Sequence, residues 1–281
     1  MQKNRCREKE RRYRERKRIV RMRRTGLFLA VCSILLVIGS FGIWSVQGER
    51  TTKSKSSESK VEQVFRMSSK KEYHEVQRIQ QDYEELLVLA NKENMLPQNY
   101  KVNLRKICNG RLEAADVLCD DLTKMLADAR EEGYQYYIAS AYRTREYQRK
   151  LIDHDVKKHR GKGMSYEEAL QETYRQVMPA GYSEHETGLA LDILVSGNSN
   201  MDLTQEVFPG NQWLRTHCAE YGFVLRYPKE KEEITGIDYE PWHFRYVGKE
   251  AAEYLTKYNL TLEEFWKIYE KSENHSGFPK S

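Results

Sequence analysis

The chain has 281 residues, which is enough for one sizeable domain with accessory segments. Charged residues make up 32% and aromatic residues 11%, so we expect most of the chain to fold as an ordinary globular protein. The net charge of +5 is unevenly distributed, because residues 1–24 contain thirteen Lys or Arg and three Glu. This segment carries +10 and the remainder −5, which argues against a nucleic-acid-binding body.

An uncharged stretch, GLFLAVCSILLVIGSFGIWSV, occupies residues 26–46, directly after a basic arm at residues 1–25. A helix of this length spans roughly 30 Å, the hydrocarbon thickness of a bilayer. A cleaved signal peptide is the rival interpretation, but its apolar region has about 7–15 residues and ends at a small-x-small site. We therefore predict a single transmembrane helix in the cell membrane. The positive-inside rule places the arm in the cytoplasm and the rest of the chain outside.

Residues 47–70 are rich in Lys, Ser, Thr and Glu, and predict a flexible stalk. Apolar residues then recur three and four apart as far as Pro97, which predicts an extracellular helix at residues 71–96. Two interpretations stay open for this helix. It is either a coiled-coil or docking helix outside the following domain, or a helix packed on the surface of that domain.

Helices and short strands alternate irregularly over residues 97–271, without a repeating βαβ unit. The apolar spacing predicts helices at residues 111–132, 142–151, 165–177, 211–221, 248–258 and 261–271. Aromatic and apolar runs predict strands at residues 134–141, 189–195, 223–226 and 242–247. This order indicates an α+β domain with a small, mostly antiparallel sheet flanked by helices, followed by a polar tail at residues 272–281.

Three of the five cysteines, Cys108, Cys119 and Cys218, follow the predicted membrane segment. Three thiols allow at most one internal disulfide, and Cys108 and Cys119 are the pair nearest in sequence. None of them has the C-x-x-C spacing of a metal knuckle, so a zinc ion here would be bound by histidine and carboxylate.

Two polar clusters carry residue types suited to metal chemistry. His185 and Asp192 lie seven residues apart, among small residues that lead into an apolar run. An unpaired carboxylate in such a run would be costly to bury. Fifty residues later, His243 follows Glu240 by three positions. Two histidines, an aspartate and a glutamate suit a catalytic zinc site with a general base, although structural pairing of the same groups stays open.

Three segments together resemble a known family. They are SAYR at residues 140–143, SEHETGLALD at residues 183–192 and EPWHFRYVG at residues 240–248. In this order they are similar to the bacterial D-alanyl-D-alanine carboxypeptidases of the VanY type, whose relatives include L,D-carboxypeptidases that trim cell-wall peptides. The resemblance covers residues 97–271 and implies a hedgehog/DD-peptidase-like zinc carboxypeptidase domain.

The resemblance also implies roles for individual residues. Zinc would be bound by His185, Asp192 and His243, and Glu240 would be the general base. Substrate binding is implied for Arg143, Gln148 and Ser183. Arg143 would also act in catalysis, and its task as a carboxylate clamp or as an oxyanion partner stays open.

The function implied is that of a membrane-anchored, zinc-dependent D,D-carboxypeptidase that removes the terminal D-alanine from peptidoglycan stem peptides. Two alternatives are an L,D-carboxypeptidase acting on tetrapeptide stems and a non-catalytic, zinc-stabilised wall-binding module. We expect no nucleic-acid partner.

Overall fold

The computed structural model describes residues 70–276 of the chain. The predicted basic arm, the transmembrane helix, all but the last residue of the stalk and the end of the polar tail lie outside the described residues. Among the helices that are described, none is both long enough and apolar enough to span a bilayer.

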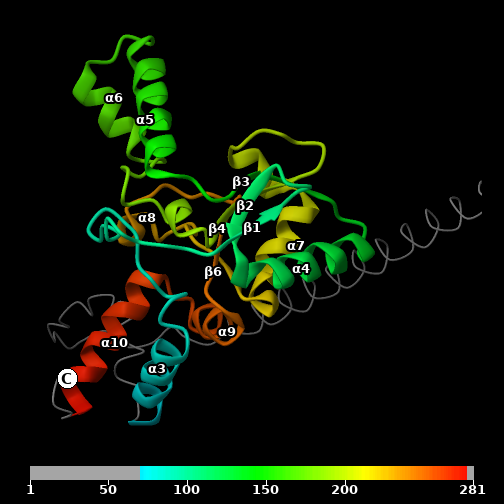
Figure 1. The fold of residues 1–281 in the computed structure, drawn as a ribbon, viewed down its shortest axis with the longest axis vertical. Coiled ribbons are helices and arrows are strands. Elements are labelled where there is room, and N and C mark those ends of the chain that lie inside the picture. Colours follow the sequence, from blue (N-terminus) through cyan, green and yellow to red (C-terminus); the bar gives the residue numbers. More distant parts are fainter. Residues whose placement is uncertain (1–69, 277–281) are drawn as a thin grey trace, which may run out of the picture. The chain divides into compact units, whose positions relative to one another are not determined.

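A four-stranded antiparallel sheet lies at the centre of the fold (Figure 1). Its strands, in spatial order, are β3 (Tyr136–Ser140), β4 (Ala190–Val195), β6 (His243–Tyr246) and β5 (Phe223–Leu225). The register places Ser140 opposite Asp192, and Asp192 opposite His243. Three polar side chains from distant parts of the sequence therefore lie in one row across the sheet.

A hairpin of two short strands, β1 (Leu104–Ile107) and β2 (Leu112–Ala115), stands where the sequence predicted the start of a helix. The prediction of a helix from residue 111 is wrong for this segment. Residues 108–110 all have positive φ and reverse the chain, so the backbone of β2 pairs with β1. The helix α4 (Cys119–Glu131) begins only after a 3-10 turn at Asp116–Leu118.

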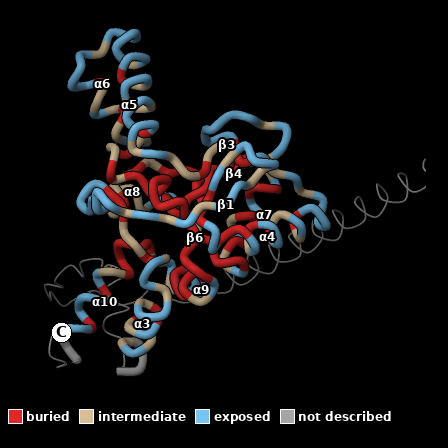
Figure 2. Tube along the Cα trace, viewed as in Figure 1, coloured by how far each residue is buried: buried red, intermediate tan, exposed pale blue. Residues whose placement is uncertain are grey.

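The remaining helices surround the sheet. They are α5 (Arg145–Arg160), α6 (Tyr166–Thr173), α7 (Pro209–His217), α8 (Glu232–Thr235), α9 (Lys249–Tyr258) and α10 (Leu262–Ser276). Apolar side chains of α4 and α7 form one core with the sheet. The α5–α6 pair stands away from the sheet and is largely exposed (Figures 1 and 2). The α+β class and the antiparallel sheet are confirmed.

The helix α3 (Lys70–Asp82) ends well before the predicted limit at residue 96. Residues 83–97 contain turns but no further helix or strand. Val76 and Ile79 of α3 are buried in a second core together with Leu255 and Phe265 of α9 and α10. The second interpretation, a helix packed on the surface of the domain, therefore agrees with these contacts. At the other end, α10 continues five residues beyond the predicted limit, to Ser276.

All three described cysteines are free, so the disulfide that the sequence allowed between Cys108 and Cys119 is absent. The Sγ of Cys119 donates to the carbonyl oxygen of Ala115 at 3.4 Å, in the first turn of α4. Cys119 is buried in the core next to the sheet, whereas Cys108 is part of the turn between β1 and β2.

Replacing Gly248 by alanine should lower the free energy of unfolding by about 3 kcal/mol. Gly248 has a φ of +82°, and an added Cβ would lie 2.5 Å from Cδ1 of Tyr83. Gly133→Ala is the matched control, because Gly133 has a φ of +92° and open space around it. The control should lose only about 1 kcal/mol. Urea unfolding measures both values, and equal losses would contradict close packing between Tyr83 and Gly248.

Candidate active site

The two polar clusters of the sequence come together at the middle of the sheet. His185 lies on a 3-10 turn, η2 (Glu184–Thr187), that leads into β4, while Asp192 belongs to β4 and His243 to β6. The turn ends at Gly188, whose φ is +72° and where a Cβ would lie 3.0 Å from the backbone nitrogen of Ala115. Glycine is required here because this close approach leaves no room for a side chain.

The side chains of His185, Asp192 and His243 form a compact, buried cluster. One potential ligand atom from each residue lies within 4.8 Å of the other two. The Nε2 of His185 is 3.3 Å from Oδ2 of Asp192, and the Nδ1 of His243 is 3.2 Å from Oδ1 of Asp192. Each of the three residues is at most 4% exposed.

The hydrogen bonds around the cluster leave its inward-facing atoms available for a metal ion. The Nδ1 of His185 is 2.7 Å from the carbonyl oxygen of Ala141, so this nitrogen donates and the lone pair resides on Nε2. The Oδ1 of Asp192 is buried and accepts no hydrogen bond. Two imidazole nitrogens and a carboxylate oxygen are the donor set of a catalytic zinc site, so the residues present fit zinc.

Burial and neighbouring charges shift the pKa values in the cluster. Burial, with the charge of Arg143, lowers the pKa of His185 to about 4, which favours the neutral imidazole that binds metals. Burial alone would lower the pKa of His243, but the nearby carboxylates of Asp192 and Glu184 outweigh it and raise the pKa to about 9. Burial likewise opposes ionisation of Asp192, yet the two histidines and Arg143 hold its pKa well below the usual value.

Glu240 lies beside the cluster, with its Oε2 3.6 Å from Nδ1 of His243. Its position is fixed by a backbone hydrogen bond of 3.1 Å to the carbonyl oxygen of Tyr227. Burial raises the pKa of Glu240 to about 8. A carboxyl group with this pKa can take up and release a proton near neutral pH, as a general base must.

A cavity of about 300 Å³ opens over the cluster, and the predicted substrate residues Arg143, Gln148 and Ser183 line it. Arg143 donates from Nη2 to Asp192 and from Nε to Ser140, each at 2.7 Å. Gln148 donates from Nε2 to the carbonyl oxygen of Met178 at 2.8 Å, and its Oε1 is buried without a hydrogen-bond partner. The structure thus gathers every predicted site residue around one cavity.

Sequence reasoning missed Glu184, which precedes His185 and is also buried against His243. Its Oε1 accepts from Nε of Arg226 at 2.7 Å and from Nη1 of Arg245 at 2.8 Å. Glu184 and Glu186 both belong to a polar run, so nothing local indicates that one of them faces His243. By contrast, His217 stacks on Trp213, with ring centroids 4.7 Å apart, and contributes nothing to the cluster.

Comparisons with known proteins agree with this arrangement. The model of the VanY family, described as D-alanyl-D-alanine carboxypeptidase, matches residues 112–249. A D-alanyl-D-alanine carboxypeptidase of Enterococcus faecalis is 39% identical over 64% of this chain, and the chain covers 65% of that protein's length, just under two thirds. The putative carboxypeptidase YodJ of Bacillus subtilis is 37% identical over 68% of this chain and 70% of its own length.

Several solved structures share the fold. A vancomycin-resistance D,D-pentapeptidase VanY variant with Zn(II) has a TM-score of 0.59 and 35% identity, covering 65% of this chain and 99% of its own. VanYB in complex with D-alanine-D-alanine has a TM-score of 0.59 and 37% identity, covering 65% of this chain and 97% of its own. The LdcB LD-carboxypeptidase has a TM-score of 0.56 and 33% identity, covering 67% of this chain and 88% of its own.

The His185→Ala variant should lose the zinc that the native chain binds, because one of only three protein ligands is removed. His217→Ala is the matched control and should retain about one zinc per chain. Atomic absorption after gel filtration measures the metal content. A His185→Ala protein with an unchanged zinc content would contradict the assignment of the cluster.

Proposed function

Because the chain belongs to the VanY family of D-alanyl-D-alanine carboxypeptidases, we propose that it is a zinc-dependent D,D-carboxypeptidase. Its substrates would be peptidoglycan stem peptides, from which it removes the terminal D-alanine. The observation that carries the proposal is the buried cluster of His185, Asp192 and His243 beside Glu240. A related VanY structure in complex with Zn(II) and another in complex with D-alanine-D-alanine support it.

The reaction divides between the metal and the carboxylate of Glu240. Zinc, when bound by His185, Asp192 and His243, supplies Lewis-acid chemistry that polarises the substrate carbonyl and makes water more acidic. Glu240 accepts the proton from the attacking water and then donates it to the amine of the departing D-alanine. Burial keeps the pKa of Glu240 near 8 in the metal-free protein, so its carboxyl group suits both proton transfers.

Recognition of the free carboxylate of the substrate falls to the polar groups of the same cavity. Arg143 is held through Nε and Nη2, and within the described residues its Nη1 makes no hydrogen bond. The fixed guanidinium therefore offers Nη1 to the terminal carboxylate or to the developing oxyanion. Ser183 adds a hydroxyl group that can donate to the carboxylate, whereas the free Oε1 of Gln148 can only accept, from an N–H or O–H of the substrate.

An L,D-carboxypeptidase acting on tetrapeptide stems is the second candidate, and similarity to the LdcB LD-carboxypeptidase favours it. Incubation with defined tetra- and pentapeptide muropeptides, followed by mass analysis of the products, separates the two. Loss of the terminal residue from pentapeptides alone supports the D,D assignment, whereas loss from tetrapeptides alone contradicts it. The third candidate, a non-catalytic wall-binding module, does not require a general base such as Glu240.

Replacing Glu240 by glutamine should lower kcat by about 10²–10⁴-fold while the zinc content stays unchanged, because only the proton acceptor is lost. Asp238→Asn is the matched control, since Asp238 lies two residues away in a partly exposed ion pair with Arg175. Steady-state release of D-alanine measures kcat for both variants. Undiminished turnover by Glu240→Gln would contradict the assigned role.

We also propose that residues 26–46 anchor the chain in the cell membrane as a single pass, with the N-terminus in the cytoplasm. The uncharged length of this segment and the basic arm before it support the proposal. The full chain should remain in the membrane fraction after an alkaline wash, and a chain lacking residues 1–46 should be released. Recovery of the full chain in the wash would contradict the anchor.

A further inference from the structure

His243 has a second buried face, which points away from the proposed metal. Its Nδ1 faces Asp192 and Glu240, whereas its Nε2 lies 3.6 Å from Oε2 of Glu184. Both Nε2 of His243 and Oε2 of Glu184 are buried, their separation is just longer than a hydrogen bond, and neither has a hydrogen-bond partner in the described part of the chain. Each is therefore the polar group that best satisfies the other.

The other oxygen of Glu184 holds this carboxylate in place. Its Oε1 accepts from Nε of Arg226 at 2.7 Å and from Nη1 of Arg245 at 2.8 Å. All three side chains are at most 1% exposed. Two charged donors on Oε1 fix the rotation of the carboxylate, so that Oε2 remains directed at His243.

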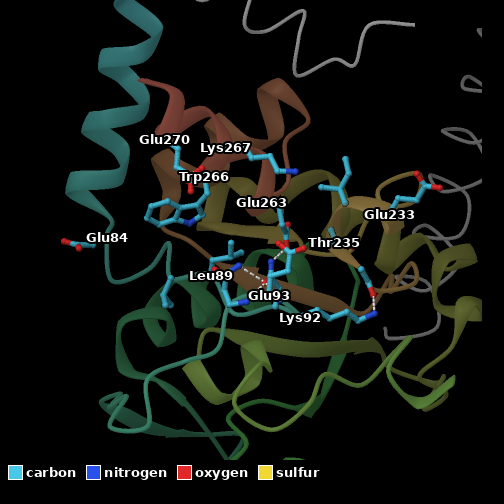
Figure 3. Close-up of a pocket in the computed structure, with 15 residues that line it drawn as sticks. Glu84, Leu89, Lys92, Glu93, Glu233, Thr235, Glu263, Trp266, Lys267 and Glu270 are labelled. Carbon is cyan, nitrogen blue, oxygen red and sulfur yellow. Dashed lines mark hydrogen bonds between the residues drawn. The ribbon is translucent and has the colours of Figure 1, made fainter. Parts of the chain in front are cut away.

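The two arginines are themselves held from outside the sheet. Arg226 donates from Nη1 and Nη2 to Glu263 of α10, at 2.9 and 2.6 Å. Glu263 also accepts from Nδ2 of Asn91 at 3.1 Å. Figure 3 shows Glu263 on the wall of a second cavity, separate from the one over the metal cluster, beside the segment that carries Leu89 and Glu93. Arg245 donates from Nη2 to the carbonyl oxygens of Leu86 and Val88, at 2.8 and 2.9 Å.

We propose that Glu184 is a positioning residue: it accepts the Nε2–H of His243 and so keeps the Nδ1 lone pair directed at the metal. This inference rests on the proposed zinc site. Histidine ligands of metals commonly donate their second ring N–H to a carboxylate or carbonyl, which fixes both the tautomer and the ring orientation. In His185 the two ring nitrogens have exchanged roles, because its Nδ1 donates to the carbonyl oxygen of Ala141 and its Nε2 faces the metal site.

Glu184→Gln tests this role with little change in shape. The two guanidinium groups require an acceptor, so the amide oxygen of glutamine should take the place of Oε1. Its NH2 group would then face Nε2 of His243 and donate to it, which favours the tautomer with the proton on Nδ1. That proton occupies the position from which His243 would bind the metal. The predicted effect is therefore on metal binding rather than only on folding.

The zinc dissociation constant, measured by competition with a chromophoric chelator, should rise about 10–100-fold in Glu184→Gln. The matched control is Glu186→Gln, from the same 3-10 turn. Glu186 is also buried and ion-paired, but its partners are Arg145 and the backbone nitrogen of Gly181. The control should bind zinc as tightly as the native chain, even if its unfolding temperature falls.

Three outcomes overturn the inference in different ways. A native chain with no zinc affinity overturns the proposed function and this role together. If the native chain binds zinc and the Glu184→Gln variant has the same zinc dissociation constant, this role alone is overturned. The same holds if the Glu186→Gln control loses as much zinc affinity as Glu184→Gln.

The native protein provides a readout that does not depend on any variant folding. In the ¹⁵N-labelled, zinc-loaded chain, long-range nitrogen–proton correlations should find the His243 ring proton on Nε2. A ring proton on Nδ1 would overturn the role of Glu184.

Discussion

The antiparallel pairing of β4 with β6 sets Asp192 against His243, and the rest of the site is arranged around that pair. A carboxylate in the middle of an apolar sheet is stable only when cationic or hydrogen-bonding groups surround it. Here Arg143 and the two histidines supply these groups, while β3 contributes Ser140 to orient Arg143. The strand register thus determines both how the carboxylate is stabilised and where a metal would be bound.

A chain of buried, oppositely charged side chains extends from the Asp192–His243 pair through the interior. Glu184 lies between His243 and two buried arginines, and Arg226 continues to Glu263 on α10. Removing one member of such a buried set leaves an uncompensated charge, which is strongly destabilising. Helix α10 and the 86–91 segment therefore contribute to the site through these arginines, although neither of them lines the cavity over the metal cluster.

Periodicity alone misassigned two stretches for one physical reason. Apolar residues three or four apart also occur in segments whose backbone is diverted by a turn or by contacts with distant residues. At residues 108–110 three positive φ values make a hairpin and shorten the predicted helix. After Asp82 the chain leaves the helix, so that Leu87 can enter the core of α9 and α10 while its neighbours hydrogen-bond Arg245.

The sequence by itself determined the α+β class, the two histidines and two carboxylates of the site, and the family. These depend on local patterns and on motifs whose order survives in the linear chain. Only the tertiary structure decided that Glu184 faces His243 while Glu186 faces Arg145, because both are glutamates in one short polar turn. Which of them approaches His243 depends on arginines 42 and 61 residues farther along the chain, whose positions the sheet determines.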